Sequence, residues 1–333
     1  MPLLDVRNLS THFFTRQGRL PAVDGVSFQI EAGESLALVG ESGCGKSVTA
    51  ASILRLVPEP PGRIVNGEIW FQGRDLLRLP AEDMRGLRGD RIGMIFQQPM
   101  TSLNPVFTIG DQIAEVVREH RKVSRSTARR HAVDLLNLVR IPDPDRQVRE
   151  YPHRLSGGMR QRAMIAIALA CDPALLIADE PTTALDVTTQ AQIFDLLGDL
   201  KQRLGMAMLL ITHDLGVVAQ TAHRVLVMYA GRVVEEATTE NLFKNQLHPY
   251  TRGLLQSLPR PNVEADIAGQ RSPLREIAGT VPSLVALPAG CRFAPRCPHA
   301  LHACRQADVR LEPFAGGRAA ACLRAAELQR AVS

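Results

Sequence analysis

The sequence contains a glycine-rich stretch, GESGCGKS, at residues 40–47. It fits the pattern G-x-x-x-x-G-K-[ST], in which successive backbone N–H groups surround nucleotide phosphates, the lysine reaches the terminal phosphates and the last hydroxyl binds Mg²⁺. An apolar run, ESLALVG, precedes the stretch and the helix-compatible VTAASILRLV follows it, as the pattern requires. The predicted phosphate site comprises Gly40, Glu41, Ser42, Gly43, Cys44, Gly45, Lys46, Ser47 and Val48.

A second apolar run, LLIADE at residues 175–180, ends in the carboxylates of Asp179 and Glu180. A strand of this kind delivers its terminal acids to one edge of a sheet. Asp179 would then lie beside a Mg²⁺ ion, and Glu180 could polarise a water molecule for in-line attack on a phosphorus atom. Many strands end in acids, so this pattern indicates phosphoryl transfer only together with the phosphate loop.

The composition is that of a globular protein and restricts the partners. The 333 residues are 45% apolar and 22% charged, and the aromatic share of 4% argues against a base-stacking surface and so against nucleic acid. The net charge of +5 fits a solvated basic surface. We find no secretory signal and no apolar run long enough to span a bilayer, so we expect no membrane crossing.

Short apolar runs alternate with segments of helical periodicity, which predicts an α/β domain. A helical insertion is expected over about residues 99–170. The predicted division is a domain over residues 1–258, which contains that insertion, and a proline- and arginine-rich extension over residues 259–333.

The segment RLSGGMRQRAMIAIALA, at residues 154–170, contains LSGGM. With it the chain resembles the ATP-binding cassette (ABC) family, whose signature is LSGGQ-like. Further motifs agree in order and spacing: Gln97 in FQQP matches the Q-loop, residues 184–186 (ALD) the D-loop, and His213 in ITHD the H-switch. The resemblance covers residues 1 to about 235. It implies the P-loop NTPase fold of an ABC nucleotide-binding domain, with a RecA-like α/β core, a β-subdomain and a helical signature subdomain.

In this family two cassettes pair head to tail and enclose two ATP molecules. The resemblance implies that Glu180 acts as general base, that His213 contacts the γ-phosphate and that Lys46 holds the phosphates. The implied Mg²⁺ contacts are Ser47, Gln97 and Asp179. Phe13 would stack on adenine, with Phe14 as the alternative. The residues that would complete the partner's ATP site are Ser156, Gly157, Gly158 and Asp186.

Four longer stretches, including residues 151–190 and 248–260, are similar to the ATPase subunits of bacterial dipeptide/oligopeptide importers, with nickel importers as close relatives. The one departure is FQQP where FQDP is expected. The resemblance implies a peripheral subunit at the cytoplasmic face of the bacterial inner membrane. Its partners would be a second ABC ATPase subunit, two transmembrane permease subunits and an extracytoplasmic peptide-binding protein. Residues 100–112 would receive the permease or serve as a plain connector.

Three alternatives to peptide import stay open on the sequence. The first is the same role in an importer of nickel or another small solute. The second is a soluble ABC ATPase, and the third is a redox regulator that carries a cluster. The second would require a twin cassette or a coiled-coil insertion, and neither is found in the sequence.

Four cysteines near the C-terminus have the spacing Cys291-x₅-Cys297-x₆-Cys304-x₁₇-Cys322. Because we find no secretory signal, metal binding or redox chemistry explains these cysteines better than disulfide bonds do. Unliganded core thiols, a zinc site with histidine as a substitute ligand and an iron–sulfur cluster all stay open, although no CxxC pair favours zinc. The tails of similar importer ATPases resemble [4Fe–4S] carriers, which favours that cluster, with Zn²⁺ as the alternative. We expect this tail outside the ATP site and near the membrane subunits.

The other two cysteines have simpler interpretations. Cys171 ends the signature helix and is expected in the core. Cys44 lies within the phosphate loop and, if it is reachable, would make ATP hydrolysis sensitive to thiol reagents, with protection by ATP.

Overall fold

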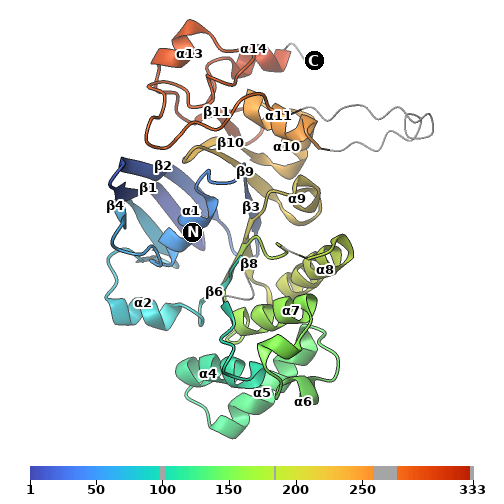
Figure 1. Cartoon of the computed structure of the whole chain (residues 1–333). Coiled ribbons are helices and arrows are strands. Elements are labelled where there is room, and N and C mark those ends of the chain that lie inside the picture. The colour runs from blue at the N-terminus through green and yellow to red at the C-terminus, as the bar shows by residue number, and fades with distance from the viewer. Residues whose placement is uncertain (98–101, 184, 259–275, 331–333) are drawn as a thin grey trace, which may run out of the picture.

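The strands of the protein form two sheets (Figure 1). The computed structural model describes residues 1–97, 102–183, 185–258 and 276–330. The larger sheet has eight strands in the order β11-β12-β10-β9-β3-β8-β7-β6, and the smaller sheet has four in the order β2-β1-β4-β5.

The centre of the larger sheet is parallel. Its strands are β9 (Arg224–Tyr229), β3 (Ser35–Val39), β8 (Ala207–Ile211), β7 (Leu175–Asp179) and β6 (Ile92–Ile95). Every residue of β3, β7 and β8 is buried, as expected of parallel strands covered on both faces. Because the strands are parallel, their carboxyl ends meet at one edge of the sheet, where ligands of such sheets commonly bind.

The smaller, antiparallel sheet packs beside the first. It comprises β1 (Leu4–Thr15), β2 (Gly18–Ile30), β4 (Gly62–Phe71) and β5 (Arg74–Asp75). Apolar side chains of this sheet, such as Leu4 and Ile69, share a core with Leu36 and Leu38 of β3. Helices α1 (Lys46–Ile53) and α2 (Ala81–Leu87) belong to the same part of the molecule.

A group of helices lies between β6 and β7 in the chain. These are α4 (Ile109–Arg121), α5 (Arg125–Leu138), α6 (Pro144–Gln147), a 3₁₀ turn (Pro152–Arg154) and α7 (Gly157–Ala168). Helix α4 begins where the hydroxyl of Thr108 accepts the N–H of Asp111, and its buried Ile109, Ile113 and Val117 recur at helical spacing. The predicted start of this region, residues 99–101, lies outside the described residues.

The second half of the cassette adds α8 (Val187–Leu204), α9 (Leu215–Thr221), α10 (Thr239–Lys244) and α11 (Pro249–Gln256). Strand β10 (Arg232–Thr238) forms a hairpin with β9, and Ala230 and Gly231 at the turn both have positive φ. Among the described residues, no helix combines the length and apolarity needed to cross a bilayer.

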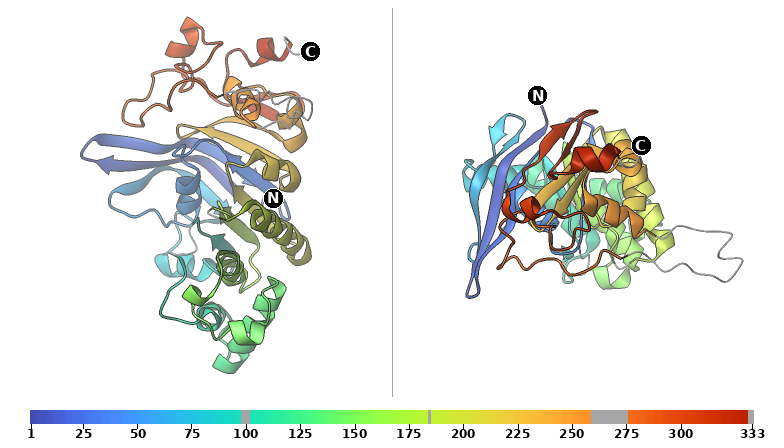
Figure 2. Two further views of the ribbon diagram at one scale, coloured as in Figure 1. Left: turned by 45° about the vertical axis from the view of Figure 1, so that its right-hand side comes forward. Right: turned by 90° about the horizontal axis from the view of Figure 1, so that it is seen from above.

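The C-terminal segment extends the larger sheet. Strand β12 (Arg318–Ala320) pairs with β10, and β11 (Glu312–Phe314) pairs with β12, while α13 (His302–Gln306) and α14 (Ala325–Arg330) flank them. Residues 259–275, which open the predicted extension, lie outside the described residues. In Figure 1 and in the left view of Figure 2, this segment, in red, lies at the opposite end of the molecule from α4–α6, in green.

Candidate functional site: an ATP site and a four-cysteine pocket

The glycine-rich stretch forms a tight loop between β3 and α1. A Cβ atom on Gly40 would lie 2.2 Å from the carbonyl oxygen of Met228, and one on Gly45 would lie 2.2 Å from that of Ala22. Gly45 also has a φ of 108°, in the region that favours glycine. Only glycine therefore allows the loop to approach its neighbours this closely. Ser42 and Gly43 at the tip of the loop, and Ser47 at the start of α1, are exposed.

Lys46, the cationic residue of the glycine-rich loop, is held by hydrogen bonds near the position where nucleotide phosphates would bind. Lys46 is 5% exposed, and its Nζ donates to the carbonyl oxygens of Gly40 at 2.7 Å and Glu41 at 3.2 Å. Ser47 Oγ donates to Asp179 Oδ1 at 3.0 Å, and burial raises the pKa of Asp179. A hydroxyl and a carboxylate side by side offer the oxygen ligands that Mg²⁺ takes.

Glu180 lies directly after β7 and contacts Gln97, a predicted Mg²⁺ contact, and His213, which was predicted to contact the γ-phosphate. Gln97 Nε2 donates to Glu180 Oε2 at 2.8 Å, and His213 Nδ1 lies 3.6 Å from Glu180 Oε1. Burial raises the pKa of Glu180, but the hydrogen bonds from Gln97 and Thr183 and the charges of His213 and Lys46 outweigh burial, so its pKa lies below the ordinary value. Glu180 is thus a carboxylate at neutral pH, the form that a general base requires.

The signature residues cap a helix away from this loop. Ser156 Oγ accepts the N–H of Met159 at 3.3 Å and so begins α7, and Asp186 begins α8 in the same way through Thr189. Gly157 and Gly158 form the first turn of α7. No hydrogen bond in the described part of the chain joins residues 156–158 to residues 40–47. Ala184, the first residue of the predicted D-loop, lies outside the described residues.

The two candidate adenine-binding aromatics differ in exposure. Phe13 is half-buried in β1, with its ring against Gly62 of β4, while Phe14 is 52% exposed. The assignment of Phe13 stays a prediction.

The thiol of Cys44 does not reach the surface of the loop. It is 1% exposed and packs in the core between the two sheets, and burial raises its pKa. The condition for sensitivity to thiol reagents is therefore not met in this conformation. Cys171 is likewise 1% exposed, which confirms the expectation that it belongs to the core.

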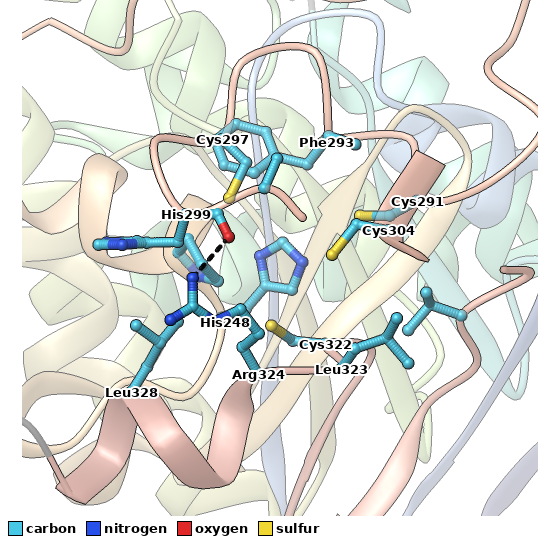
Figure 3. Close-up of a pocket in the computed structure, with 14 residues that line it drawn as sticks. His248, Cys291, Phe293, Cys297, His299, Cys304, Cys322, Leu323, Arg324 and Leu328 are labelled. Atoms are coloured by element: carbon cyan, nitrogen blue, oxygen red, sulfur yellow. Dashed lines mark hydrogen bonds between the residues drawn. The ribbon is translucent and has the colours of Figure 1, made fainter. Parts of the chain in front are cut away.

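All four C-terminal cysteines line one pocket, and Figure 3 shows their sulfur atoms turned towards a common space. Burial raises the pKa of Cys322 to about 11, and the nearby thiols of Cys291, Cys297 and Cys304 add to the shift. Backbone N–H groups that can stabilise sulfur anions lie at Cys291, Cys297 and Cys322. In the described residues, no group of three or more His, Cys, Asp or Glu side chains is arranged so that it could hold a metal ion.

The structure adds residues to both sites that the sequence interpretation missed. His248, 1% exposed, lines the cysteine pocket, and the hydroxyl of Tyr250 accepts the N–H of Glu41 at 2.9 Å. The HPY run that contains both residues was a signal for them. Arg296, between two of the cysteines, pairs with Glu41. The expectation of a tail outside the ATP site thus needs correction, because Arg296 contacts the phosphate loop from this segment.

The tail is also not placed beside the segment expected to meet the membrane subunits. The described part of that segment leads into α4, and Figure 1 shows α4 and the red C-terminal segment at opposite ends of the molecule. The expectation that the cysteines lie near the membrane subunits stays a prediction.

The fold and the motifs at the edge of the parallel sheet define an ATP-binding cassette ATPase. The family described as "ABC transporter" matches residues 23–183, and that described as "Oligopeptide/dipeptide transporter, C-terminal region" matches residues 234–304. The chain therefore belongs to the ABC transporter ATPases that carry the oligopeptide/dipeptide transporter C-terminal region.

Individual relatives agree with this assignment. A probable peptide ABC transporter ATP-binding protein of Sinorhizobium fredii is 56% identical over 98% of this chain and 96% of its own. The oligopeptide transport ATP-binding protein AppD of Bacillus subtilis is 53% identical over 96% of each. A solved dimeric post-hydrolysis structure of the ATP-binding cassette MJ0796, bound to ADP and Pi, has a TM-score of 0.64 and 28% identity over 71% of this chain and 98% of its own.

Proposed function

We propose that this chain hydrolyses ATP with Mg²⁺ and thereby powers the import of dipeptides or oligopeptides across the bacterial cytoplasmic membrane. The observation that carries the proposal is the contact of Glu180 with both Gln97 and His213, beside the pair of Ser47 and Asp179. These residues follow β6, β7, β8 and β3, so the sheet itself brings them together. The names of the relatives and the C-terminal family support a peptide as the transported solute.

In this proposal, catalysis is mostly positioning and electrostatics. The loop N–H groups and Lys46 would hold the phosphates, and Ser47, Gln97 and Asp179 would hold Mg²⁺, which would supply positive charge to stabilise the charge that develops on the phosphates. Glu180 accepts a proton from the attacking water, and His213 contacts the γ-phosphate. Ser156, Gly157, Gly158 and Asp186 are assigned to the ATP site of a second cassette.

The proposed partner subunits follow from the assignment of the signature residues to a second cassette. We infer that a second, related ABC ATPase subunit supplies the opposite signature, that two permease subunits carry the peptide, and that an extracytoplasmic binding protein delivers it. The chain would then lie at the cytoplasmic face of the membrane. Val106 is 70% exposed and Phe107 50% exposed just before α4, and such apolar side chains suit a permease contact. Met100 and Thr101, the start of the predicted docking segment, lie outside the described residues.

We also infer that the pocket of Cys291, Cys297, Cys304 and Cys322 holds a [4Fe–4S] cluster, with Zn²⁺ as the alternative. A single zinc ion needs each sulfur about 2.3 Å away. In a cluster each thiolate binds a different iron atom, so the sulfurs surround a larger body. Four thiols that line one pocket match the four thiolate ligands that such a cluster takes. Cys291, Cys297 and Cys322 also pack against apolar neighbours.

The Lys46→Ala variant should abolish peptide uptake in cells that contain the complete transporter, because the phosphates lose the cation of the loop. The measurement is accumulation of a labelled dipeptide and a labelled oligopeptide, with the wild-type chain as reference and nickel uptake as the comparison. Uptake of nickel but of neither peptide would exclude the peptide assignment. Undiminished peptide uptake by Lys46→Ala would exclude the ATPase role.

The Phe107→Asp variant should bind MgATP as the wild type does and yet support little uptake, because it changes the surface before α4 and not the ATP site. The measurement is co-purification of the permease subunits with the tagged chain. Leu301→Asp, which alters a side chain of similar exposure (49%) beside α13, is the matched control and should retain the permeases. Normal co-purification of Phe107→Asp would place the permease contact elsewhere.

A further inference from the structure

Arg296 reaches from the cysteine-bearing segment to the phosphate loop. Its Nη1 lies 2.7 Å from Glu41 Oε2 and its Nη2 lies 3.1 Å from Glu41 Oε1, so the two side chains form a bidentate pair. The side chain of Arg296 is 6% exposed and that of Glu41 is 26% exposed. The pair joins residues that are 255 positions apart in the chain.

The guanidinium of Arg296 is held on all sides. Besides Glu41, Nε donates to the carbonyl oxygen of Ala278 at 3.0 Å, Nη2 to that of Ile277 at 3.0 Å, and Nη1 to the hydroxyl of Tyr229 at 3.4 Å. These contacts give each of the five N–H donors an acceptor. A surface ion pair contributes little because it is solvated and mobile, whereas this pair is partly buried and bidentate. A lysine at this position would keep the positive charge but could not form the bidentate contact that the planar guanidinium makes.

Glu41 links the ion pair with Arg296 to the proposed nucleotide site. It follows Gly40 in the loop, and its N–H donates to Tyr250 Oη at 2.9 Å. Its carbonyl oxygen accepts Lys46 Nζ at 3.2 Å and the N–H of Cys44 at 3.3 Å. The carboxylate, the N–H and the carbonyl of Glu41 are therefore all engaged. The direction of its carbonyl helps to set where the ammonium of Lys46 stands.

We propose that Arg296 is a positioning residue for ATP binding, which acts through Glu41 to hold the phosphate loop in the shape that receives the nucleotide. The proposal rests on the proposed ATP site at residues 40–47. It assigns to the C-terminal segment a part in the ATP site of its own chain. Arg296 contacts neither the site of hydrolysis nor Glu180, so its effect should fall on nucleotide affinity and not on the chemical step.

The same segment ties Arg296 to the cysteine pocket. The N–H of Arg296 donates to the carbonyl oxygen of Phe293 at 2.9 Å, and the N–H of Cys297 to that of Ala294 at 3.4 Å. Arg296 thus occupies one turn with two pocket cysteines, Cys291 and Cys297, on either side of it.

The test measures MgATP binding to the full-length chain by calorimetry, and kcat and KM for ATP in the assembled transporter. We expect Arg296→Gln to raise Kd and KM for ATP about tenfold, which corresponds to about 1.4 kcal/mol, with kcat changed less than about threefold. Arg296→Lys should recover part of the affinity. Glu41→Gln should match Arg296→Gln, and the double variant should be no weaker than either single variant, because both remove one interaction.

Arg318→Gln is the matched control. Arg318 lies in the same segment and donates to the carbonyl oxygens of Ala315 and Asn245, but it does not contact the phosphate loop. Unchanged affinity in Arg296→Gln or in Glu41→Gln would overturn the proposal, as would equal weakening by Arg318→Gln or additive losses in the double variant. The Glu41 variant keeps the proposal testable if Arg296→Gln does not fold. Full activity of Lys46→Ala would instead refute the proposed ATP site itself.

Discussion

The Glu180→Gln variant should bind MgATP with wild-type affinity and hydrolyse it about 10³-fold more slowly. Glutamine has nearly the same shape and can still contact Gln97, but its amide cannot accept the proton of the attacking water. In the wild-type structure the low pKa of Glu180 keeps the carboxylate ionised at neutral pH. Loss of activity on acidification through this group should therefore begin below the ordinary glutamate range.

The measurement for Glu180 is steady-state phosphate release by the assembled transporter, together with a pH profile of kcat. Glu82→Gln, which alters an exposed carboxylate that pairs with Arg85 at the surface of α2, is the control and should leave the rate unchanged. Glu180→Gln with a rate within about threefold of wild type would falsify its assignment as the general base. An acid limb of kcat near neutral pH would show that another group controls the rate.

Replacement of Cys297 by serine should remove the [4Fe–4S] cluster that we propose for the C-terminal pocket. The full-length chain, purified without air, is expected to contain about four irons and to absorb visible light through sulfide-to-iron charge transfer. Cys297→Ser takes one of four thiol ligands from the pocket, and we expect it to lose most of the iron and the colour. The measurements are metal content per chain and the visible absorption spectrum.

Cys171→Ala is the control for the cysteine pocket. Cys171 is a buried core residue, but it lies near α4 and α7 and is far along the chain from the pocket. It should keep the wild-type iron content and spectrum. A colourless wild-type chain with one zinc per molecule would reverse the choice between cluster and zinc. If the chain contains neither iron nor zinc, the four thiols are unliganded core side chains.

The sequence alone was sufficient to propose those ATP-site residues whose geometry depends on near neighbours. Gly40, Gly45 and Lys46 belong to one short turn, and the loop's shape follows from glycine conformations and a fixed spacing. Asp179 and Glu180 were found because an apolar strand ends at them. The parallel α/β core was predictable for the same reason, since the alternation of apolar runs and helical periodicity is a local signal.

Other features depended on contacts between segments that are remote in the chain. The burial of Cys44 follows from the packing of two sheets, which no spacing within the loop specifies. The addition of β11 and β12 to the larger sheet follows from backbone pairing with β10, whereas the composition indicated only a separate appendix.

The sequence by itself determined the class of this protein, the order of its motifs and the presence of four cysteines. Only the tertiary structure placed those cysteines around one pocket and brought Arg296 against Glu41. The physical reason is range. Turns, strands and helices are set by residues a few positions apart, and they recur wherever that pattern recurs. An ion pair across 255 positions exists only when the sheet, α11 and the C-terminal segment are packed together.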